Sequence, residues 1–578
     1  MPRSRAPLAC AGLALLAACG GPPAPGAVAP AATDSARFEQ LVARYVAKPI
    51  VADDPERDAT DAALERLDAA AERQAAARAG GWLRELAAID TARLAESQRI
   101  DWLLLRAALR RTVADTVFQP ARRVPGRYLT LGGLYWRVMG ERPPTAADWR
   151  AALADLQRVP RALALGRRQL EAPPPLWSRL AAGSARSYVA FLRDELPPRV
   201  DDVAPDSLKP RLRQAAGEAA AALAGYAAWL DDSLPPGADA SWAIGAPDYD
   251  RLLRDAHFLP FTAETMIEEG RRIHEATKRA LDSLAAQVAP GRTWRQLVDE
   301  MQGRHPEPGA ITDAYRRASR GILAALIRDD LIRIPPCEEL DFVPTPPQLR
   351  ETYAWGGYGG VVPRDGALVG RFFVTDVVPG MTPAQVREKL RAQNHGWITV
   401  IALHEGYPGH HLQTVYQKRG TRPLRQELAN TYAQEGWALY AEHWMARAGV
   451  LADADARLAQ LQMRLWRTAR VIIDPSLHTG RMTHAEAVQF FVDEVGLERS
   501  AAEAEVNRFT TWPTQAPSYI VGWLELERLK ADLRRALGAA FSEKGYVERV
   551  LEAGALPPAL LRRAVLAAYG LDDSRVSR

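Results

Sequence analysis

The stretch His404-Glu405-Gly406-Tyr407-Pro408-Gly409-His410-His411 interrupts a segment that otherwise has the composition of a helix. Pro408 has no N–H to donate to the carbonyl of His404, and its ring clashes with that carbonyl. Gly409 can take backbone angles closed to other residues. The Pro-Gly pair therefore predicts a kink or bulge inside the helix, a kind of irregularity that is frequent at functional sites. The alternative is a helix that ends at Tyr407 and leaves the histidines on a surface turn.

The same stretch nearly matches the zinc motif His-Glu-x-x-His, but a proline stands where the second histidine should be. In the usual motif two imidazoles four residues apart share one helix face and bind one Zn²⁺, while the Glu acts on water. Here the next histidines, His410 and His411, follow His404 by six and seven residues. On a straight helix the sixth residue lies about 9 Å further along the axis, too far to share an ion. A bulge of two residues would return His410 to the missing position, so the sequence predicts a metal site.

A second helix, expected over residues 424–448, contains two glutamates that suit a third ligand. Glu435 and Glu442 are seven residues apart, so they project from the same face. One can bind a metal while the other orients a histidine. We assign Glu435 as the ligand, because Gly436 beside it permits close approach of another backbone, and keep Glu442 as the alternate.

Two motifs together resemble a bacterial family catalogued as domain of unknown function 885 (DUF885). They are His-Glu-Gly-Tyr-Pro-Gly-His-His-Leu-Gln at 404–413 and Glu-Gly-Trp-Ala-Leu-Tyr-Ala-Glu at 435–442. Members of this family are often secreted lipoproteins of mostly helical fold and are regarded as candidate zinc-dependent peptidases. The similarity extends from about Phe38 to near the C-terminus.

The resemblance implies a role for each residue of the motifs. His404 and His410 are the expected histidine ligands of one Zn²⁺ per chain, with His411 as the alternate. Glu435 is the expected carboxylate ligand, and Glu405 is the expected catalytic base.

Three residues further along the chain are candidates for stabilising the oxyanion that peptide hydrolysis forms. Zinc-dependent hydrolysis needs such a donor, and a His, Tyr or Arg can supply it. His478, Tyr519 and Arg508 lie in stretches that resemble later family motifs. Each also has a structural interpretation: the histidine can cap a turn, the tyrosine can be a core aromatic, and the arginine can pair with Glu505. We interpret His395 and His484 as structural or surface residues.

The N-terminus predicts an exported, lipid-anchored protein. Arg3 and Arg5 precede a mainly apolar run that is too short to span a bilayer, which indicates a signal peptide over residues 1–18. The sequence Leu-Ala-Ala-Cys-Gly at 16–20 resembles a bacterial lipobox, so Cys19 is the expected lipid attachment point. The alternative is an ordinary secretion signal with an incidental cysteine.

Residues 19–34 then read as a flexible tether at the membrane. The glycines after Cys19, with no aspartate among them, resemble outer-membrane routing. We therefore expect a protein of the cell envelope that faces the periplasm from the outer membrane.

Composition excludes several other classes of protein. The 74 basic and 70 acidic residues nearly balance, which argues against nucleic acid as a partner. Of the three cysteines, Cys10 is expected to leave with the signal peptide and Cys19 to be acylated, so we expect no disulfide partner for Cys337. Stability must therefore come from the packing of a large core.

Helical periodicity dominates the mature chain and predicts a mainly α, two-lobed, zinc-peptidase-like fold with a small β patch beside the metal helix. We expect an N-terminal helical lobe over residues 35–240 and a catalytic helical lobe over residues 241–578. The expected helices are 36–48, 57–90, 96–114, 145–166, 174–196, 206–232, 263–288, 293–302 and 309–329.

The β patch is expected within residues 333–380, which are rich in Pro, Gly and aromatic residues. A strand at 368–378 is its clearest element, and we expect residues 369–375 to hold the substrate backbone by strand addition. The alternative is an ordinary patch that covers the core. The metal helix is expected to begin at Thr382, which starts an N-cap sequence.

These observations together predict a zinc-dependent hydrolase, and a peptidase above other kinds. Its expected partners are a peptide or peptide-like substrate and a membrane, reached through the lipidated Cys19. An envelope amidase or deacylase with the same metal site is an alternative. A lipoprotein that only binds or scaffolds is a third possibility.

Overall fold

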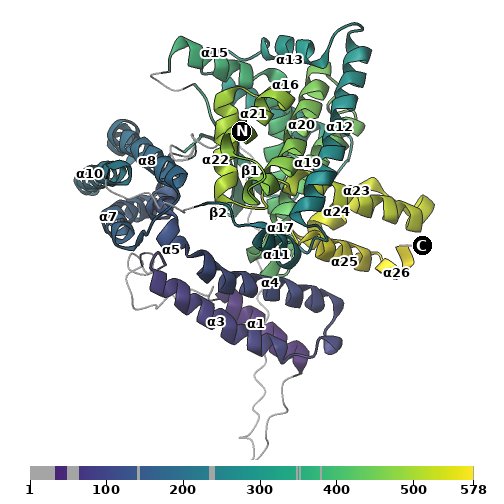
Figure 1. The fold of residues 1–578 in the computed structure, drawn as a ribbon, viewed down its shortest axis with the longest axis horizontal. Helices are drawn as coiled ribbons and strands as arrows, with labels where there is room; N and C mark the ends of the chain where they lie inside the picture. The colour runs from purple at the N-terminus through teal and green to yellow at the C-terminus, as the bar shows by residue number, and fades with distance from the viewer. Residues whose placement is uncertain are drawn as a thin grey trace, which may run out of the picture.

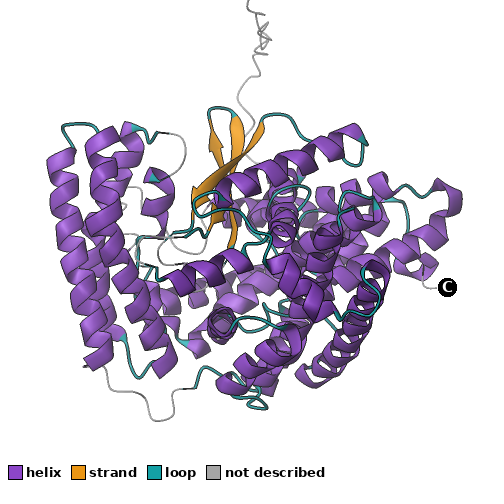
Figure 2. Ribbon diagram, turned by 90° about the horizontal axis from the view of Figure 1, so that it is seen from above, coloured by secondary structure: helices purple, strands orange, loops and turns teal. Residues whose placement is uncertain are grey.

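The computed structural model of the chain describes residues 33–47, 64, 66–139, 143–232, 241–346, 349, 353, 355–377 and 381–576. The expected signal peptide, Cys19 and almost all of the expected tether lie outside the described residues. Helices make up most of the described chain, and one small sheet lies among them (Figure 2). None of these helices is both long and apolar enough to cross a bilayer.

One group of helices forms a bundle with its own apolar core, seen at the left of Figure 1. The buried residues of this core lie between Tyr128 and Leu230 in the sequence, and α8 and α10 contribute several alanines to it. The bundle comprises α5 (Pro120–Arg123), α6 (Gly132–Val138), α7 (Ala146–Gln169), α8 (Pro175–Ala190), a π-helical turn (Phe191–Glu195), α9 (Leu196–Val203) and α10 (Lys209–Asp232).

The larger core contains the first helices of the chain as well as most of the later ones. It begins with α1 (Asp34–Ala47), α3 (Ala69–Ala87) and α4 (Glu96–Phe118). The packing therefore differs from the expected grouping of residues 35–240 in one lobe. Asp101 of α4 is fully buried and accepts a hydrogen bond from Arg425 at 2.6 Å, which ties α4 to the later part of the chain.

The remaining helices build the body around the site. Those before the sheet are α11 (Ala246–Asp255), α12 (Ala263–Val288), α13 (Trp294–Gln302) and α14 (Ile311–Arg328). Those after it are α15 (Pro383–Ala392), α16 (His395–Glu405), α17 (His410–Gly420), α18 (Pro423–Glu427), α19 (Thr431–Arg447), α20 (Ala454–His478), α21 (His484–Phe490), α22 (Arg499–Thr511), α23 (Ser518–Leu537), α24 (Glu543–Ala553), α25 (Pro558–Ala568) and α26 (Asp573–Val576).

Local capping explains where several helices begin. Thr262 and Thr293 each accept a hydrogen bond from the backbone three residues on, and the side chain there returns one. Thr382 caps in the same way, but its helix α15 ends at Ala392. The helix that carries His404 is a separate one, α16, which Asn394 caps. The expected start of the metal helix at Thr382 was therefore wrong by one helix.

The sheet has three strands in the order β1-β3-β2: β1 (Glu338–Pro344), β2 (Gly356–Arg364) and β3 (Ala367–Val374). β3 pairs with β1 in parallel and with β2 in antiparallel orientation. Residues 369–374 therefore already have strand partners on both sides. The expectation that residues 369–375 receive the substrate by strand addition is wrong for this reason, and β2 is the edge strand nearer the site.

Candidate functional site

The Pro-Gly stretch separates two helices rather than bending one. α16 ends at Glu405, α17 begins at His410, and the Tyr407–Pro408 peptide bond between them is cis. A Cβ on Gly409 would lie 1.9 Å from the carbonyl oxygen of His404, so only glycine lets the second helix start so close to the end of the first. The indole of Trp437 donates to the Pro408 carbonyl at 2.9 Å and holds the turn. The break is complete where a kink was expected, and the histidines are not on a surface turn.

The two expected histidine ligands meet the expected carboxylate ligand. Nε2 of His410 lies 3.1 Å from Oε2 of Glu435, and Nε2 of His404 lies 3.5 Å from the same oxygen. Their imidazole rings are 4.8 Å apart and nearly perpendicular. α16, α17 and α19 thus bring together side chains that are 31 positions apart in the sequence at most.

This arrangement fits a zinc ion. His404, Glu405 and His410 also each offer a ligand atom within 4.8 Å of the others. Tetrahedral Zn²⁺ with bonds of about 2.0–2.2 Å sets its ligand atoms roughly 3.3 Å apart. The contacts of 3.1 and 3.5 Å around Glu435 match this spacing. Two histidines and one glutamate are also the donor set of many catalytic zinc sites.

The pKa values of the carboxylates differ according to their neighbours. Burial by itself raises the pKa of Glu435, but the His410 and His404 rings bring this pKa well below its ordinary range. Burial raises the pKa of Glu405 to about 7; the His410 ring opposes this rise and the Glu435 carboxylate adds to it. Glu435 is therefore held as an anion, whereas Glu405 can exchange a proton near neutral pH.

Glu442, the alternate ligand, lies on the other side of His404. Its Oε1 is 2.8 Å from Nδ1 of His404 and 3.0 Å from Nη2 of Arg467. The carboxylate is fully buried. It therefore orients the imidazole so that Nε2 faces Glu435, instead of reaching the ion position itself.

His411, the other alternate, points away from the cluster. Its Nε2 contacts Glu338 of β1, and its Nδ1 lies 3.2 Å from the hydroxyl of Tyr358. A Cβ on Gly370 would lie 2.2 Å from that Nδ1, so the ring fills the space beside β3. His411 thus joins α17 to the sheet, and it is His410 that the structure brings to Glu435.

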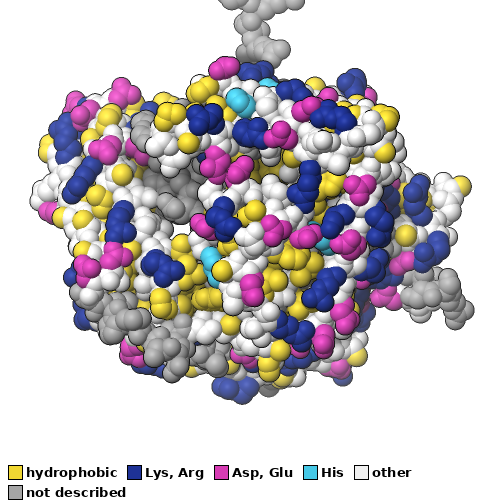
Figure 3. Space-filling view, turned by 45° about the horizontal axis from the view of Figure 1, so that its top comes forward, with side chains coloured by type: hydrophobic (Ala, Val, Ile, Leu, Met, Phe, Trp, Pro, Cys, Tyr) yellow, Lys and Arg dark blue, Asp and Glu magenta, His cyan; other side chains and the backbone are white. Residues whose placement is uncertain are grey.

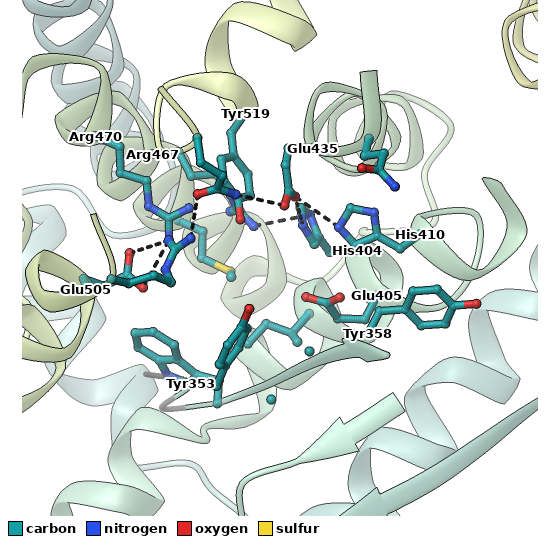
Figure 4. Close-up of a pocket in the computed structure, with 18 of the residues that line it drawn as sticks. Tyr353, Tyr358, His404, Glu405, His410, Glu435, Arg467, Arg470, Glu505 and Tyr519 are labelled. Atoms are coloured by element: carbon teal, nitrogen blue, oxygen red, sulfur yellow. Dashed lines mark hydrogen bonds and ion pairs between the residues drawn. The ribbon is translucent and has the colours of Figure 1, made fainter. Parts of the chain in front are cut away.

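A cavity of about 270 Å³ opens beside the cluster (Figure 4). His404, Glu405, His410 and Glu435 line one side. Tyr519 and Arg508, two of the expected oxyanion donors, line it as well. The Tyr519 ring stacks on His404 at 5.9 Å, and burial raises its pKa to about 12, so its hydroxyl stays protonated at neutral pH.

The third expected donor, His478, is not brought to this cavity. It is fully buried, and its Nε2 lies 3.0 Å from the carbonyl oxygen of Phe509. Its ring stacks on Tyr249 in a separate apolar cluster. His395 lies exposed at the start of α16, and His484 contacts Asn507 at 2.9 Å, in keeping with structural roles.

Several residues of the cavity were not expected from the sequence. Arg467 and Arg470 of α20 and Glu505 of α22 line it. Nearly every residue of α20 from Ala456 onward is buried, and two arginines three apart in such a helix are the signal that could have identified them. Tyr358 and the glycines before it in β2 form another part of the lining.

One exposed aromatic residue lines the cavity and also two neighbouring cavities. Trp512 is 46% exposed and lines this cavity together with two neighbouring ones of about 240 and 710 Å³. Figure 3 shows apolar side chains gathered across the middle of one face, while acidic and basic ones are mixed over the rest. Trp512 therefore borders all three cavities.

The chain resembles known proteins in both sequence and structure. The family described as "Bacterial protein of unknown function (DUF885)" matches residues 51–565. No curated protein matches the chain significantly.

Two solved structures share its fold over almost their whole length. One is a "putative lipoprotein of unknown function" from Shewanella oneidensis, with a TM-score of 0.70 and 21% identity; the match covers 93% of this chain and 100% of that one. The other is a "putative lipoprotein" from Colwellia psychrerythraea, with a TM-score of 0.73 and 17% identity over 92% of this chain and 99% of that one.

Proposed function

This chain belongs to the DUF885 family, whose description gives no activity, and we propose from its side chains that it is a zinc-dependent peptidase. The observation that carries the proposal is the convergence of His404 and His410 on one oxygen of Glu435, at 3.5 and 3.1 Å, beside a cavity. Burial of a carboxylate and two imidazoles without a bound cation would be costly. Zinc bound there would supply Lewis-acid activation of water and of a carbonyl group.

Glu405 is the proposed proton carrier. It is adjacent in sequence to His404 and lines the same cavity, and its carboxylate lies within 4.8 Å of a ring nitrogen of both His404 and His410. It takes the proton of the attacking water and passes it to the leaving amine.

Tyr519 is the proposed oxyanion donor. Its hydroxyl stays protonated at neutral pH, and its ring is fixed between His404 and the guanidinium of Arg470, whose carbon lies 4.5 Å from the ring centre. A fixed donor of this kind stabilises negative charge in the transition state without reorganisation. Arg508 lines the same cavity, donates to Gln515 at 2.6 Å and pairs with Glu505 at 3.2 Å, so it adds a fixed guanidinium group to the lining.

The edge of the sheet favours a peptide over other amides. Gly356, Gly357 and Tyr358 of β2 line the cavity, and no strand of the described residues pairs with the outer edge of β2. An extended substrate backbone can pair with this edge and present its carbonyl to the site. An envelope amidase or deacylase would use the same metal chemistry but would not need a strand edge.

We also propose that the protein is anchored in the cell envelope through a lipid on Cys19. The lipobox-like sequence at 16–20 supports this, and both solved relatives are described as lipoproteins. When both proteins are expressed in a bacterium, radiolabelled palmitate should be incorporated into the wild-type protein but not into the Cys19→Ser variant.

The experiment that tests the activity compares wild type with Glu405→Gln. Purified wild type should contain about one zinc per chain by elemental analysis and should cleave members of a peptide library. Glu405→Gln should retain the zinc and lose turnover by at least the 10²-fold or so typical of a lost general base. Wild type that comes out free of metal, or a variant that keeps full activity, would overturn the proposal.

A further inference from the structure

Three arginines line the same cavity, and one of them, Arg467, also lies 3.3 Å from Nδ1 of His404. Arg467 and Arg470 come from α20, and Arg508 comes from α22. Figure 4 shows Arg467 and Arg470 beside Tyr519 and above Glu505, across the cavity from His410. Arg467 is 3% exposed and Arg470 is 2% exposed. Guanidinium groups this deeply buried require anions or hydrogen-bond acceptors around them.

The described carboxylates neutralise only part of this charge. Glu505 lies 2.7 Å from Arg470 and 3.2 Å from Arg508, and Glu442 lies 3.0 Å from Arg467. Two carboxylates thus face three guanidinium groups. The two other glutamates that line the cavity, Glu405 and Glu435, lie at the histidine cluster.

Hydrogen-bond donors also remain unused in this cluster. Within the part of the chain that the structure describes, Nε and Nη1 of both Arg467 and Arg470 have no acceptor, nor does the indole N–H of Trp466 between them. Burial lowers the pKa of Arg470, and the positive charges of Arg508 and Arg467 lower it further against the effect of Glu505. An additional anion in the cavity would relieve this repulsion.

We propose that Arg467, Arg470 and Arg508 form a subsite that binds one carboxylate group of the substrate. This inference rests on the proposed function, since it places that carboxylate on a peptide bound at the zinc site. The planar guanidinium group matches a carboxylate with two parallel hydrogen bonds. With Glu405 and Glu435 counted against a bound Zn²⁺, the three arginines and the carboxylates of Glu442 and Glu505 leave one positive charge, which suits a singly charged carboxylate better than a doubly charged phosphate. The carboxylate is either the C-terminus of the peptide or an acidic side chain.

Binding to the zinc-loaded Glu405→Gln protein distinguishes these sources without turnover. Three probes are compared by calorimetry: acetyl-Ala-Ala-Ala, its C-terminal amide, and acetyl-Ala-Asp-Ala amide. We expect at least one of the two carboxylate probes to bind tenfold or more tightly than the uncharged amide. The probe that does so identifies the source of the carboxylate. Equal binding of all three, or no binding of any, would overturn the proposal.

Arg470→Met in the same background tests whether the arginines cause the preference. Methionine keeps an apolar chain between Trp466 and Tyr519 but removes the charge, so the tenfold preference should disappear while zinc content stays the same. Arg470→Lys should retain part of the preference, and Arg168→Met, on the exposed surface of α7, should retain all of it. A preference that survives Arg470→Met would place the carboxylate elsewhere, for example on the zinc itself.

The two proposals fail separately in these experiments. Zinc-loaded wild type that prefers the carboxylate probes but cleaves no peptide would overturn the proposed activity and keep the subsite. Cleavage of peptides without any preference for a carboxylate would overturn the subsite and keep the proposed activity.

Discussion

Glu442 and His404 form a hydrogen-bonded pair at 2.8 Å. The contact is made by Nδ1 of the imidazole, on the opposite side of the ring from Nε2, which lies near Glu435. The pair is buried, and Arg467 completes it at 3.0 Å from the carboxylate. The carboxylate fixes which nitrogen of His404 carries the proton and which one faces Glu435. The proposed zinc site would therefore depend on a residue that is not itself one of the proposed ligands.

Glu442→Gln tests this dependence. The amide oxygen can still accept from His404, but the negative charge that makes the imidazole a better ligand is lost. We expect zinc affinity to fall by about 10–100-fold, the usual cost of losing such a supporting carboxylate. Competition with a fluorescent zinc chelator measures it. Unchanged affinity in a folded variant would contradict the assigned role.

His410→Ala and His411→Ala are matched substitutions of neighbouring residues with different expected results. His410→Ala removes a proposed ligand, so zinc content should drop to near zero. His411→Ala breaks contacts with Glu338 and Tyr358 and leaves a cavity beside β3, so it should keep zinc but lose about 2–4 kcal/mol of stability. Elemental analysis and urea unfolding measure both. The assignment fails if the two variants exchange these outcomes.

The backbone features around His404, His410 and Glu435 could be predicted from the sequence, because they depend on neighbouring Pro and Gly residues and on side-chain spacing. Pro408 and Gly409 predicted an interruption between His404 and His410, and the structure has one. Gly436 was expected to allow a close backbone approach, and a Cβ there would lie 2.5 Å from Gly522 of α23. Helix 263–288 was predicted with the bounds that α12 has.

The features that could not be predicted depend on contacts between segments that are far apart in the sequence. The sequence of β3 is compatible with either an edge strand or a central strand. It is central because it also pairs with β1, some thirty residues earlier in the chain. His478 looked suitable as a donor, but the direction in which α20 turns buries it against Tyr249 instead. The same helix directs Arg467 and Arg470 to the cavity; their spacing could have singled them out, but which cavity they line depends on distant segments.

Gly436→Ala tests the contact between α19 and α23. The added methyl group would lie 2.5 Å from the backbone of Gly522, and a backbone cannot move aside as a flexible side chain can. We expect a loss of about 1–3 kcal/mol in the free energy of unfolding, together with weaker zinc binding because Glu435 is the adjacent residue. Gly217→Ala on α10 is the control, since a Cβ there meets nothing within 4 Å. That variant should gain about 0.5–1 kcal/mol, and a similar gain from Gly436→Ala would refute the packing argument.

Asp474 should make stability depend on pH in a direction opposite to that of most carboxylates. It is fully buried, accepts from the hydroxyl of Tyr249 at 2.6 Å, and has one oxygen without a donor among the described residues. Burial raises its pKa from 3.8 to about 7, against the effect of the Tyr249 hydrogen bond. Between these two values the folded protein holds a proton that the unfolded chain has released. The contribution of Asp474 to stability therefore falls as pH rises through this window.

Asp474→Asn isolates this effect, because asparagine does not titrate and its oxygen can still accept from Tyr249. The free energy of unfolding of the variant, minus that of wild type, should increase from pH 4 to pH 7. Its slope should stay below the limit of about 1.4 kcal/mol per pH unit for one proton. Above pH 7 the difference should level off, because Asp474 is then ionised in both states. Urea unfolding of both proteins in the same buffers measures it, and a difference that stays flat between pH 4 and 7 would mean that Asp474 is ionised in the folded protein throughout.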